Sequence, residues 1–463
     1  MKHAALLPRY ENKPKDKNKM HNKYILRTVC VLLAMMLLCL HFPIMPTSAL
    51  EVPQPERIGA AYLYNLENEQ IMFEYNAKQQ MFPAASVKVM TAVVAYEALR
   101  DRMDTTIDIT DTMIRGVSGN NIAIEAGERI LVRDLLYALL LKGANDAAYV
   151  LAHYSHGSPA AFVEKMNEKA AALGMKNTVY TNPTGMHDDL MVTTAEDQFL
   201  CARAFCSYEE LVTMSSISKH VIEATDHCVT RNLYNRNAFV SKLNSMGTIK
   251  YYYEGAKGIN FGSTTEGGDS FVTMASRNGL TYICVILGGE ESEDEEDIYA
   301  FYAAKALLDY ALDGFGYVEV LSTKRLVYDM PVSLCEETDH VMLVPAGSIK
   351  SFLPVDTDLE SELTYSYTVN CDSLTAPVEE GHQVGYISVY YKDTLLGTQP
   401  LVTQSAVKLS TFLSTLEGIK TFTQSKFFIC TAIALVVVSV GFVLTKSYLR
   451  AKKSKKSRTV RFR

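Results

Sequence analysis

Residues 82–92 read Phe-Pro-Ala-Ala-Ser-Val-Lys-Val-Met-Thr-Ala, and this stretch decides how the chain is interpreted. It opens a helix, because Val89 and Val93 begin an apolar pattern of about 3.6-residue spacing with no internal Gly or Pro. The stretch also holds a hydroxyl and an amine, at Ser86 and Lys88, as nucleophilic catalysis requires. Residues two apart on a helix differ by about 200° in direction, so Ser86 is predicted to point away from Lys88.

The segments around this helix predict an α+β fold, in which an antiparallel sheet carries helices. Runs of β-formers and the turn signal Arg-Asn-Gly indicate strands, and helical periodicity indicates helices. We expect one domain over residues 55–315. Its elements in chain order are strands at 58–66 and 71–75, a helix from about 85, helices at 131–154, 159–173 and 194–215, strands at 271–276 and 281–287, and a helix at 295–313.

From about Gly316 the pattern changes to short alternating strands with few helical runs. Residues 316–404 are therefore predicted to form a separate small all-β domain. Residues 405–426 follow as a polar, weakly amphipathic connector. The strands expected in the β domain are 318–321, 340–344, 362–369, 383–391 and 395–401.

Two basic ends flank an acidic body. Residues 1–27 carry 8 Lys/Arg and 2 Asp/Glu, residues 446–463 carry 9 Lys/Arg and no acid, and the part between them carries 28 basic and 50 acidic residues. The 19 uncharged residues 427–445 approach the roughly 20 that a transmembrane helix needs. The basic tail 446–463 then places this end in the cytoplasm and the body outside. A nucleic-acid-binding tail is the competing interpretation; beside a membrane span we expect no nucleic-acid partner.

The N-terminal segment predicts a signal peptide. Residues 1–23 form a basic n-region, and residues 24–49 hold an apolar stretch that ends in the small residues Pro-Thr-Ser-Ala. An uncleaved signal anchor is the alternative, because the residues between Arg27 and Glu51 carry no formal charge and just suffice to span a bilayer. The alternatives differ in whether the mature protein has one membrane span or two.

Four motifs stand in a fixed order along the chain: the stretch 82–92, VRDLLYALLLKGANDAAYVLA at 132–152, LGMKNTVYTNPTGMHD at 173–188, and GAKGINFGSTTEGGDSFVTMASRNGLTYICVILG at 255–288. In this order they resemble the secreted D-alanyl-D-alanine carboxypeptidases, the low-molecular-mass penicillin-binding proteins. The resemblance covers about residues 55–315. It implies a penicillin-binding-protein/β-lactamase-like transpeptidase fold and an enzyme without cofactor or metal. Such enzymes use S-x-x-K, S-x-N and K-T-G motifs, which converge on one cleft.

The resemblance implies roles for the motif residues. The Ser attacks the D-Ala-D-Ala amide, the Lys takes its proton, the S-x-N motif assists proton transfer, and the K-T-G strand receives the terminal carboxylate. In the first motif Lys88 matches the lysine, but the nucleophile position falls on Ala85, whose methyl group cannot form an acyl-enzyme. The second motif retains Asn145 and has Gly143 at the hydroxyl position.

The third motif is assigned to Gly-Ala-Lys-Gly-Ile at 255–259. It retains Lys257 and has Gly258 and Ile259 in place of the threonine and glycine. Side chains alternate along a strand, so Ile259 is expected on the same face as Lys257, where it obstructs the peptide. These three residues are the predicted substrate-binding positions.

Other candidates for chemistry are interpreted as structural. Ser118 has no lysine at helical spacing, and His187 with the two aspartates after it is interpreted as a turn. The acidic run 290–297 lacks calcium-loop spacing and is interpreted as a solvated segment before a helix. A disulfide between Cys335 and Cys371 stays open, because the cysteines form no dense framework.

We therefore expect a membrane-tethered cell-envelope protein that is a catalytically impaired pseudoenzyme. The loss of the nucleophile alone costs about 10⁶ in rate in a serine hydrolase. Lys88, Asn145 and Lys257 either form a positively charged cleft for a peptidoglycan stem peptide or are remnants kept by packing; scaffolding of envelope proteins is a further role. The alternatives are an active D-Ala-D-Ala carboxypeptidase in peptidoglycan maturation, with Ser86 as nucleophile in a distorted helix start, and a structural module acting through the β domain and connector.

Overall fold

The computed structural model describes residues 50–225, 227–292 and 297–458. The predicted basic n-region and the signal peptide or anchor therefore lie outside the described residues, as do the last five residues of the basic tail.

The first domain is built on a five-stranded antiparallel sheet in the order β2-β1-β9-β8-β7. The hairpins expected at 58–75 and 271–287 are both present, and Asn278 and Gly279 have positive φ in the turn of the second, as a type I′ turn requires. Strand β7 lies at one edge of the sheet. The strands are β1 (Ala60–Asn65), β2 (Gln70–Tyr75), β7 (Ala256–Thr264), β8 (Gly268–Arg277) and β9 (Leu280–Gly289).

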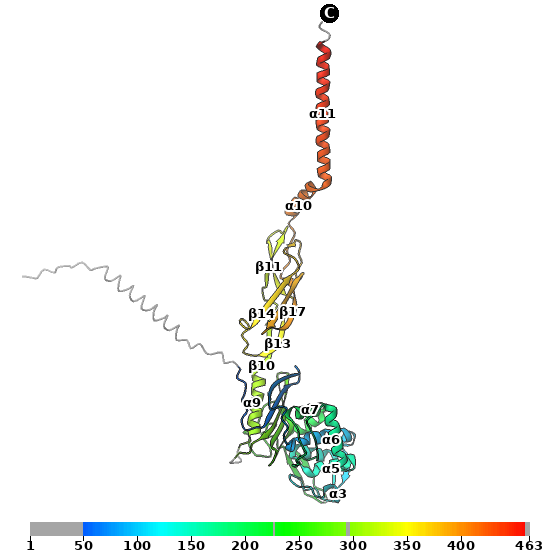
Figure 1. The fold of residues 1–463 in the computed structure, drawn as a ribbon, viewed down its shortest axis with the longest axis vertical. Helices are drawn as coiled ribbons and strands as arrows, with labels where there is room; N and C mark the ends of the chain where they lie inside the picture. Colours follow the sequence, from blue (N-terminus) through cyan, green and yellow to red (C-terminus); the bar gives the residue numbers. More distant parts are fainter. Residues whose placement is uncertain (1–49, 226, 293–296, 459–463) are drawn as a thin grey trace, which may run out of the picture. The chain divides into compact units, whose positions relative to one another are not determined.

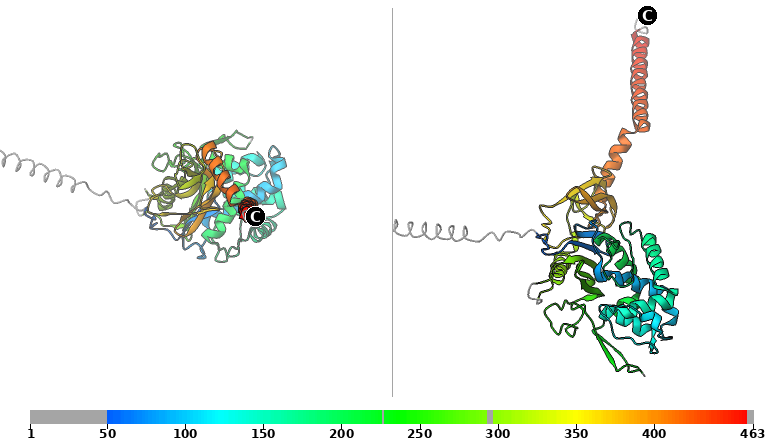
Figure 2. Two further views of the ribbon diagram at one scale, coloured as in Figure 1. Left: turned by 90° about the horizontal axis from the view of Figure 1, so that it is seen from above. Right: turned by 60° about the horizontal axis from the view of Figure 1, so that its bottom comes forward.

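Helices cover both faces of this sheet, because its central strands send apolar side chains to both sides. On β9, Ile283 and Val285 join the core shared with the main helical layer, whereas Cys284 and Ile286 join the core shared with α9 (Tyr299–Gly314). Figure 1 and the right-hand view of Figure 2 show the two helical layers on opposite sides of the sheet. The main layer includes α2 (Val87–Leu99), α3 (Asp111–Ile114), α6 (Pro159–Leu173) and the helices described next.

The helix expected at 131–154 is interrupted. It consists of α4 (Val132–Tyr137), a π-helical segment η3 (Ala138–Lys142) and α5 (Asn145–His156). Gly143 ends the first part with φ +69°, a left-handed conformation that a β-carbon disfavours. The apolar periodicity runs through the break, which is why periodicity alone predicts one helix.

The helix expected at 194–215 is also two helices, α7 (Ala195–Cys206) and α8 (Glu209–Ser216). The side chain of Thr194 caps the first by accepting the Asp197 N–H at 3.1 Å. The break allows α8 to pack against the edge strand β7. Two short antiparallel strand pairs were not expected from the sequence: β3 (Thr106–Asp108) with β4 (Arg129–Leu131), and β5 (Lys219–Ile222) with β6 (Arg231–Tyr234).

The second domain is all-β, as expected. It contains a six-stranded sheet in the order β14-β16-β17-β12-β11-β15 and a two-stranded sheet of β10 and β13. Three of these strands, β11, β13 and β15, were not predicted. Cys335 and Cys371 are free thiols. The strands are β10 (Phe315–Leu321), β11 (Tyr328–Ser333), β12 (His340–Pro345), β13 (Ile349–Pro354), β14 (Leu363–Val369), β15 (Leu374–Thr375), β16 (Gln383–Tyr391) and β17 (Thr394–Thr403).

Two helices follow the β domain, α10 (Thr411–Gln424) and α11 (Lys426–Arg458). Among the described residues, α11 is the one helix that is long and apolar enough to cross a membrane, with a mean hydropathy of 2.8. The predicted span 427–445 lies within it.

Candidate active site

A cavity of about 480 Å³ lies beside the N-terminus of α2 and the C-terminal end of β7. Ala85, Lys88, Gly143 and Asn145 all line it. The structure therefore brings together the four positions of the first two sequence motifs, although they lie on two separate segments of the chain.

The floor of the cavity carries a methyl group at the nucleophile position. Ala85 belongs to the short 3₁₀ turn η1 (Ala84–Ser86) that leads into α2. Strand β7 passes close above it: a β-carbon added to Gly262 would lie only 2.6 Å from the Ala85 β-carbon. Only a glycine allows this approach, so Gly262 is the strand residue that faces the nucleophile position.

Ser86 lies outside the cavity. Its side chain is fully buried, and its Oγ donates to the Pro83 carbonyl oxygen at 2.6 Å. Its backbone N–H donates to Ser270 Oγ at 3.1 Å. The hydroxyl is thus committed to the backbone of the turn that holds Ala85 in place.

Lys88 reaches the cavity from the first turn of α2. The side chain is 5% exposed, and its Nζ donates to the Thr184 carbonyl oxygen. Burial, together with the positive charge of Arg236, lowers the pKa of Lys88 to about 7. The amine therefore changes its charge near neutral pH.

The wall next to Lys88 is formed around the break before α5, where Lys88 Cδ lies 3.9 Å from a β-carbon added to Gly143. Asn145 Nδ2 donates to the Ser118 carbonyl oxygen at 2.8 Å, and its Oδ1 is buried with no hydrogen-bond partner among the described residues. Asn120 Nδ2 donates to the Gly143 carbonyl oxygen at 3.2 Å, which holds this left-handed residue in position. Gly143 itself presents no side chain to the cavity.

The three residues assigned to the third motif are not part of this cavity, and that assignment is corrected. Lys257 is exposed, Ile259 is 2% exposed within the core, and the Gly258 N–H donates to Ser216 Oγ of α8 at 3.0 Å. The expected obstruction by Ile259 is therefore absent. The strand faces Ala85 at Gly262 and lines the cavity farther along, at Ser263 and Thr264, because α8 covers the first part of β7.

Arg236 is the cationic residue that the sequence analysis missed. Its guanidinium lines the cavity, and its Nη1 lies 3.6 Å from a β-carbon added to Gly143 and 3.4 Å from one added to Gly262. It stands over the Phe261 ring, and the described residues offer it no hydrogen bond or ion pair. The available signal was an arginine between two turn-forming asparagines, Asn-Arg-Asn at 235–237.

The charges around Arg236 are only partly compensated. Burial lowers the pKa of Arg236, and the nearby carboxyl group of Asp269 offsets part of that effect. Burial and then the charge of Glu291 raise the pKa of Asp269 to about 7, so this acid is partly protonated at neutral pH. The cavity therefore presents two basic side chains, Lys88 and Arg236, to an anion, while Glu266 lines it as well.

The remaining candidates show no catalytic arrangement. His187 lines the cavity, packs edge-on against Phe82 and lies 3.1 Å from Asp189. Residues 293–296 of the acidic run lie outside the described residues, and Asp297 pairs with Lys250. Within the described ranges no group of three His, Cys, Asp or Glu side chains is arranged to hold a metal ion.

Comparison with known protein families agrees with this architecture. The profile described as D-alanyl-D-alanine carboxypeptidase matches residues 50–291, and that of the penicillin-binding protein 5 C-terminal domain matches residues 319–409. The chain belongs to the D-alanyl-D-alanine carboxypeptidase family. The second match shows that the β domain is also a known part of such proteins.

Individual relatives of this family match most of the chain. The D-alanyl-D-alanine carboxypeptidase DacF of Bacillus subtilis is 23% identical over 77% of this chain and 88% of its own length. DacD of Escherichia coli is 26% identical over 79% of this chain and 91% of its own. The crystal structure of penicillin-binding protein 6B from Escherichia coli, at 22% identity, shares the fold with a TM-score of 0.54 over 78% of this chain and 98% of that one.

Proposed function

We propose that this protein is a cell-envelope member of the family that has lost the hydrolytic step and retains a binding site for peptidoglycan stem peptides. The observation that carries the proposal is the methyl group of Ala85 on the floor of the cavity. Acyl transfer needs an oxygen nucleophile next to a base, and here Lys88 has no hydroxyl partner among the residues that the structure places in hydrogen-bond contact with it.

Divergence at the other two motifs supports the same conclusion. Gly262 is the glycine that faces the nucleophile position, so we infer that the third family motif corresponds to Asn-Phe-Gly at 260–262. The family's lysine position is then Asn260, which is 2% exposed and has a buried Oδ1 with no hydrogen-bond partner among the described residues. With this assignment, the first motif lacks its nucleophile, the second lacks its hydroxyl and the third lacks its lysine.

An active carboxypeptidase that uses Ser86 is the alternative. It requires Ser86 Oγ to leave its hydrogen bond with Pro83 and to emerge from a fully buried position. The turn would have to unwind next to Gly185, where a β-carbon would already lie 1.9 Å from the Ala84 carbonyl oxygen. This tight packing favours the pseudoenzyme.

The chemistry of the cavity supports binding of a peptide carboxylate. Arg236 presents a guanidinium without a partner, Lys88 adds a second buried cation, and Asn145 offers an unused acceptor for a peptide N–H. Charge-assisted hydrogen bonds from arginine to carboxylate are among the strongest in proteins. A peptide ending in a free carboxylate therefore fits this site.

Peptide binding tests this proposal directly. The full chain in lipid nanodiscs is titrated calorimetrically with an N-acetylated stem peptide ending in D-Ala-D-Ala, and with the same peptide bearing a C-terminal amide. We expect saturable binding of the acid, weaker binding of the amide, and no release of D-alanine. Equal affinities for the two peptides, or measurable D-alanine, contradict the proposal.

The location of the site follows from the C-terminal helix. We place the body outside the membrane and residues 446–463 in the cytoplasm, because α11 supplies one apolar span and the tail after it carries only positive charges. Protease added to intact cells is expected to digest the body and spare an epitope at the C-terminus. Scaffolding of envelope proteins is compatible with this topology, and cross-linking from the body tests it.

A further inference from the structure

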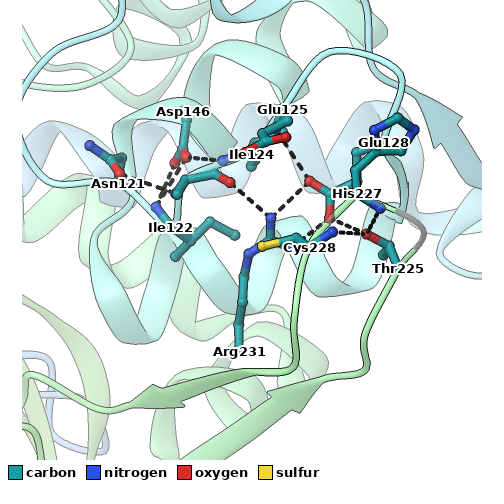
Figure 3. A network of polar contacts seen from close by, with 11 residues as sticks. Asn121, Ile122, Ile124, Glu125, Glu128, Asp146, Thr225, His227, Cys228 and Arg231 are labelled. Atoms are coloured by element: carbon teal, nitrogen blue, oxygen red, sulfur yellow. Dashed lines mark hydrogen bonds and ion pairs between the residues drawn. The ribbon is translucent and has the colours of Figure 1, made fainter.

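A buried ion pair joins two parts of the chain that have little regular structure of their own (Figure 3). Arg231, at the start of β6, donates from Nη1 to Glu128 Oε1 at 2.6 Å and from Nη2 to Glu128 Oε2 at 2.8 Å. The two side chains are 8% and 0% exposed. This two-pronged geometry fixes orientation as well as distance.

The surroundings keep the pair ionised. Burial raises the pKa of Glu128, but hydrogen bonds from Arg231 and from the Glu125 backbone outweigh burial, and the pKa lies below its usual value. Thr225 Oγ1 also donates to Glu128, whereas the Nε of Arg231 is buried with no partner among the described residues. A buried pair that leaves a donor unsatisfied is a poor device for stability alone, since apolar residues often serve as well.

The Glu128 side of the pair ends the loop that forms one wall of the cavity. Arg231 Nη2 also donates to the Ala123 carbonyl oxygen of this loop at 2.9 Å. On both sides of Ala123, the backbone N–H groups of Ile122 and Ile124 donate to Asp146 Oδ2 at 3.0 and 3.1 Å (Figure 3). The loop is thus held at its C-terminal half, and its N-terminal half carries the cavity residue Asn120.

The Arg231 side leads to Arg236, which lies near Asn120: Arg236 Nη1 and Asn120 Nδ2 are 3.6 and 3.5 Å from a β-carbon added to Gly143. Arg236 follows five residues later, and its backbone N–H donates to the Leu141 carbonyl oxygen at 3.0 Å. Because its guanidinium has no hydrogen bond within the described chain, its position depends on the backbone that carries it. Its backbone is also anchored at Leu141, so a loosening of β6 affects the guanidinium through the connecting residues 235–236 and does not move it directly.

We propose that the Glu128–Arg231 pair is a positioning clamp, which ties the loop that carries Asn120 to the segment that carries Arg236 where both meet at Gly143, and so determines how tightly the cavity holds an anionic ligand. This inference rests on the proposed function. The clamp acts through the loop and the segment that it joins, and neither Glu128 nor Arg231 is among the residues that line the cavity.

Two clamp variants and one matched control test the inference in the full chain. Glu128→Gln keeps the shape of the side chain and removes its negative charge. Arg231→Lys keeps the positive charge and removes the guanidinium that makes the two hydrogen bonds to Glu128. Asp134→Asn is the control, because Asp134 holds the neighbouring strand β5 through His220 at 2.7 Å without contacting the loop. Affinity for the D-Ala-D-Ala peptide and amide hydrogen exchange are measured well below the unfolding temperature of each variant.

We expect Glu128→Gln to weaken peptide binding about tenfold, because small displacements of binding groups have effects of this size or larger. Arg231→Lys should be intermediate, and Asp134→Asn should stay within about twofold of the unchanged protein. In the Glu128→Gln variant, amide hydrogen exchange should become faster in residues 116–125 and in residues 232–238 together. Unchanged affinity in Glu128→Gln, or an equal loss in Asp134→Asn, overturns the clamp.

The exchange measurement keeps the two proposals separable. If the unchanged protein does not bind the peptide, the proposed function fails. The rise in amide exchange in both segments of Glu128→Gln then still tests whether the ion pair couples the loop to the segment that carries Arg236. If the protein binds the peptide and exchange in Glu128→Gln rises in the loop alone, the clamp fails and the proposed function stands.

Discussion

The start of α2 and the start of β7 differ in how well the sequence locates their functional residues. At α2, the match to the first family motif placed Lys88 in the site and helical spacing directed Ser86 away from Lys88, and the structure has Lys88 in the cavity and Ser86 outside it. In β7, the retained lysine at 257 marked a segment that α8 covers; the strand faces Ala85 at Gly262 and lines the cavity at Ser263 and Thr264. On a helix, the spacing of residues along the sequence predicts the direction of each side chain. On a strand, whether a residue belongs to the site depends on which other segment packs against it.

The largest effect is expected from returning a hydroxyl to the cavity. Ala85→Ser places an oxygen one helical turn from Lys88, so fluorescent penicillin should label this variant covalently while the unchanged protein stays unlabelled. Adding Asn260→Lys should speed labelling further, because it restores the lysine of the strand motif. Gel fluorescence over time measures both rates.

The control for this experiment is Ala85→Ser combined with Lys88→Met, which should abolish labelling because it removes the base. Labelling of the unchanged protein that disappears in Ser86→Ala would show that the neighbouring serine is the nucleophile, against the geometry described above.

The second effect compares two cations. Arg236→Met should weaken binding of the D-Ala-D-Ala peptide by about ten- to a hundredfold, because it removes a desolvated charge-assisted contact. Lys257→Met is the matched control and should leave the affinity unchanged, since this side chain is exposed outside the cavity. The reverse result would reinstate the assignment based on the sequence.

The sequence was sufficient for the architecture because its signals are local. Hairpin turns, helical periodicity and the change of pattern near residue 316 predicted both domains, and the α+β fold is confirmed by the profile match over residues 50–291. The break at Gly143 was missed because apolar spacing continues across it, and only the left-handed backbone reveals it. Arg236 was missed because it enters the cavity from a segment without periodicity.

The third effect is a dependence of binding on pH. Burial and the charge of Arg236 lower the pKa of Lys88 to about 7, so Lys88 is a cation below pH 7 and neutral above it. Affinity for a peptide carboxylate should therefore fall several-fold as the pH rises through 7. The pKa of Asp269, raised by burial to about 7, makes this acid an anion near Arg236 over the same range, which acts in the same direction. Titration calorimetry from pH 6 to 8 measures the trend, and Lys88→Met should reduce its slope; an affinity that rises with pH contradicts this charge assignment.

The smallest effect is expected at Ser86. Ser86→Ala removes one buried hydrogen bond to Pro83 and should lower the free energy of unfolding by about 1 kcal/mol. Thermal unfolding measures this loss. Peptide affinity should not change, because the hydroxyl lies outside the cavity; a clear loss of affinity would mean that the side chain reaches the ligand.

Intact-mass spectrometry of the unchanged protein after prolonged exposure to benzylpenicillin decides whether the site has lost its nucleophile. We expect one species at the unmodified mass, because the position beside Lys88 carries no hydroxyl to acylate. A stoichiometric penicilloyl adduct that maps to a single serine would contradict it.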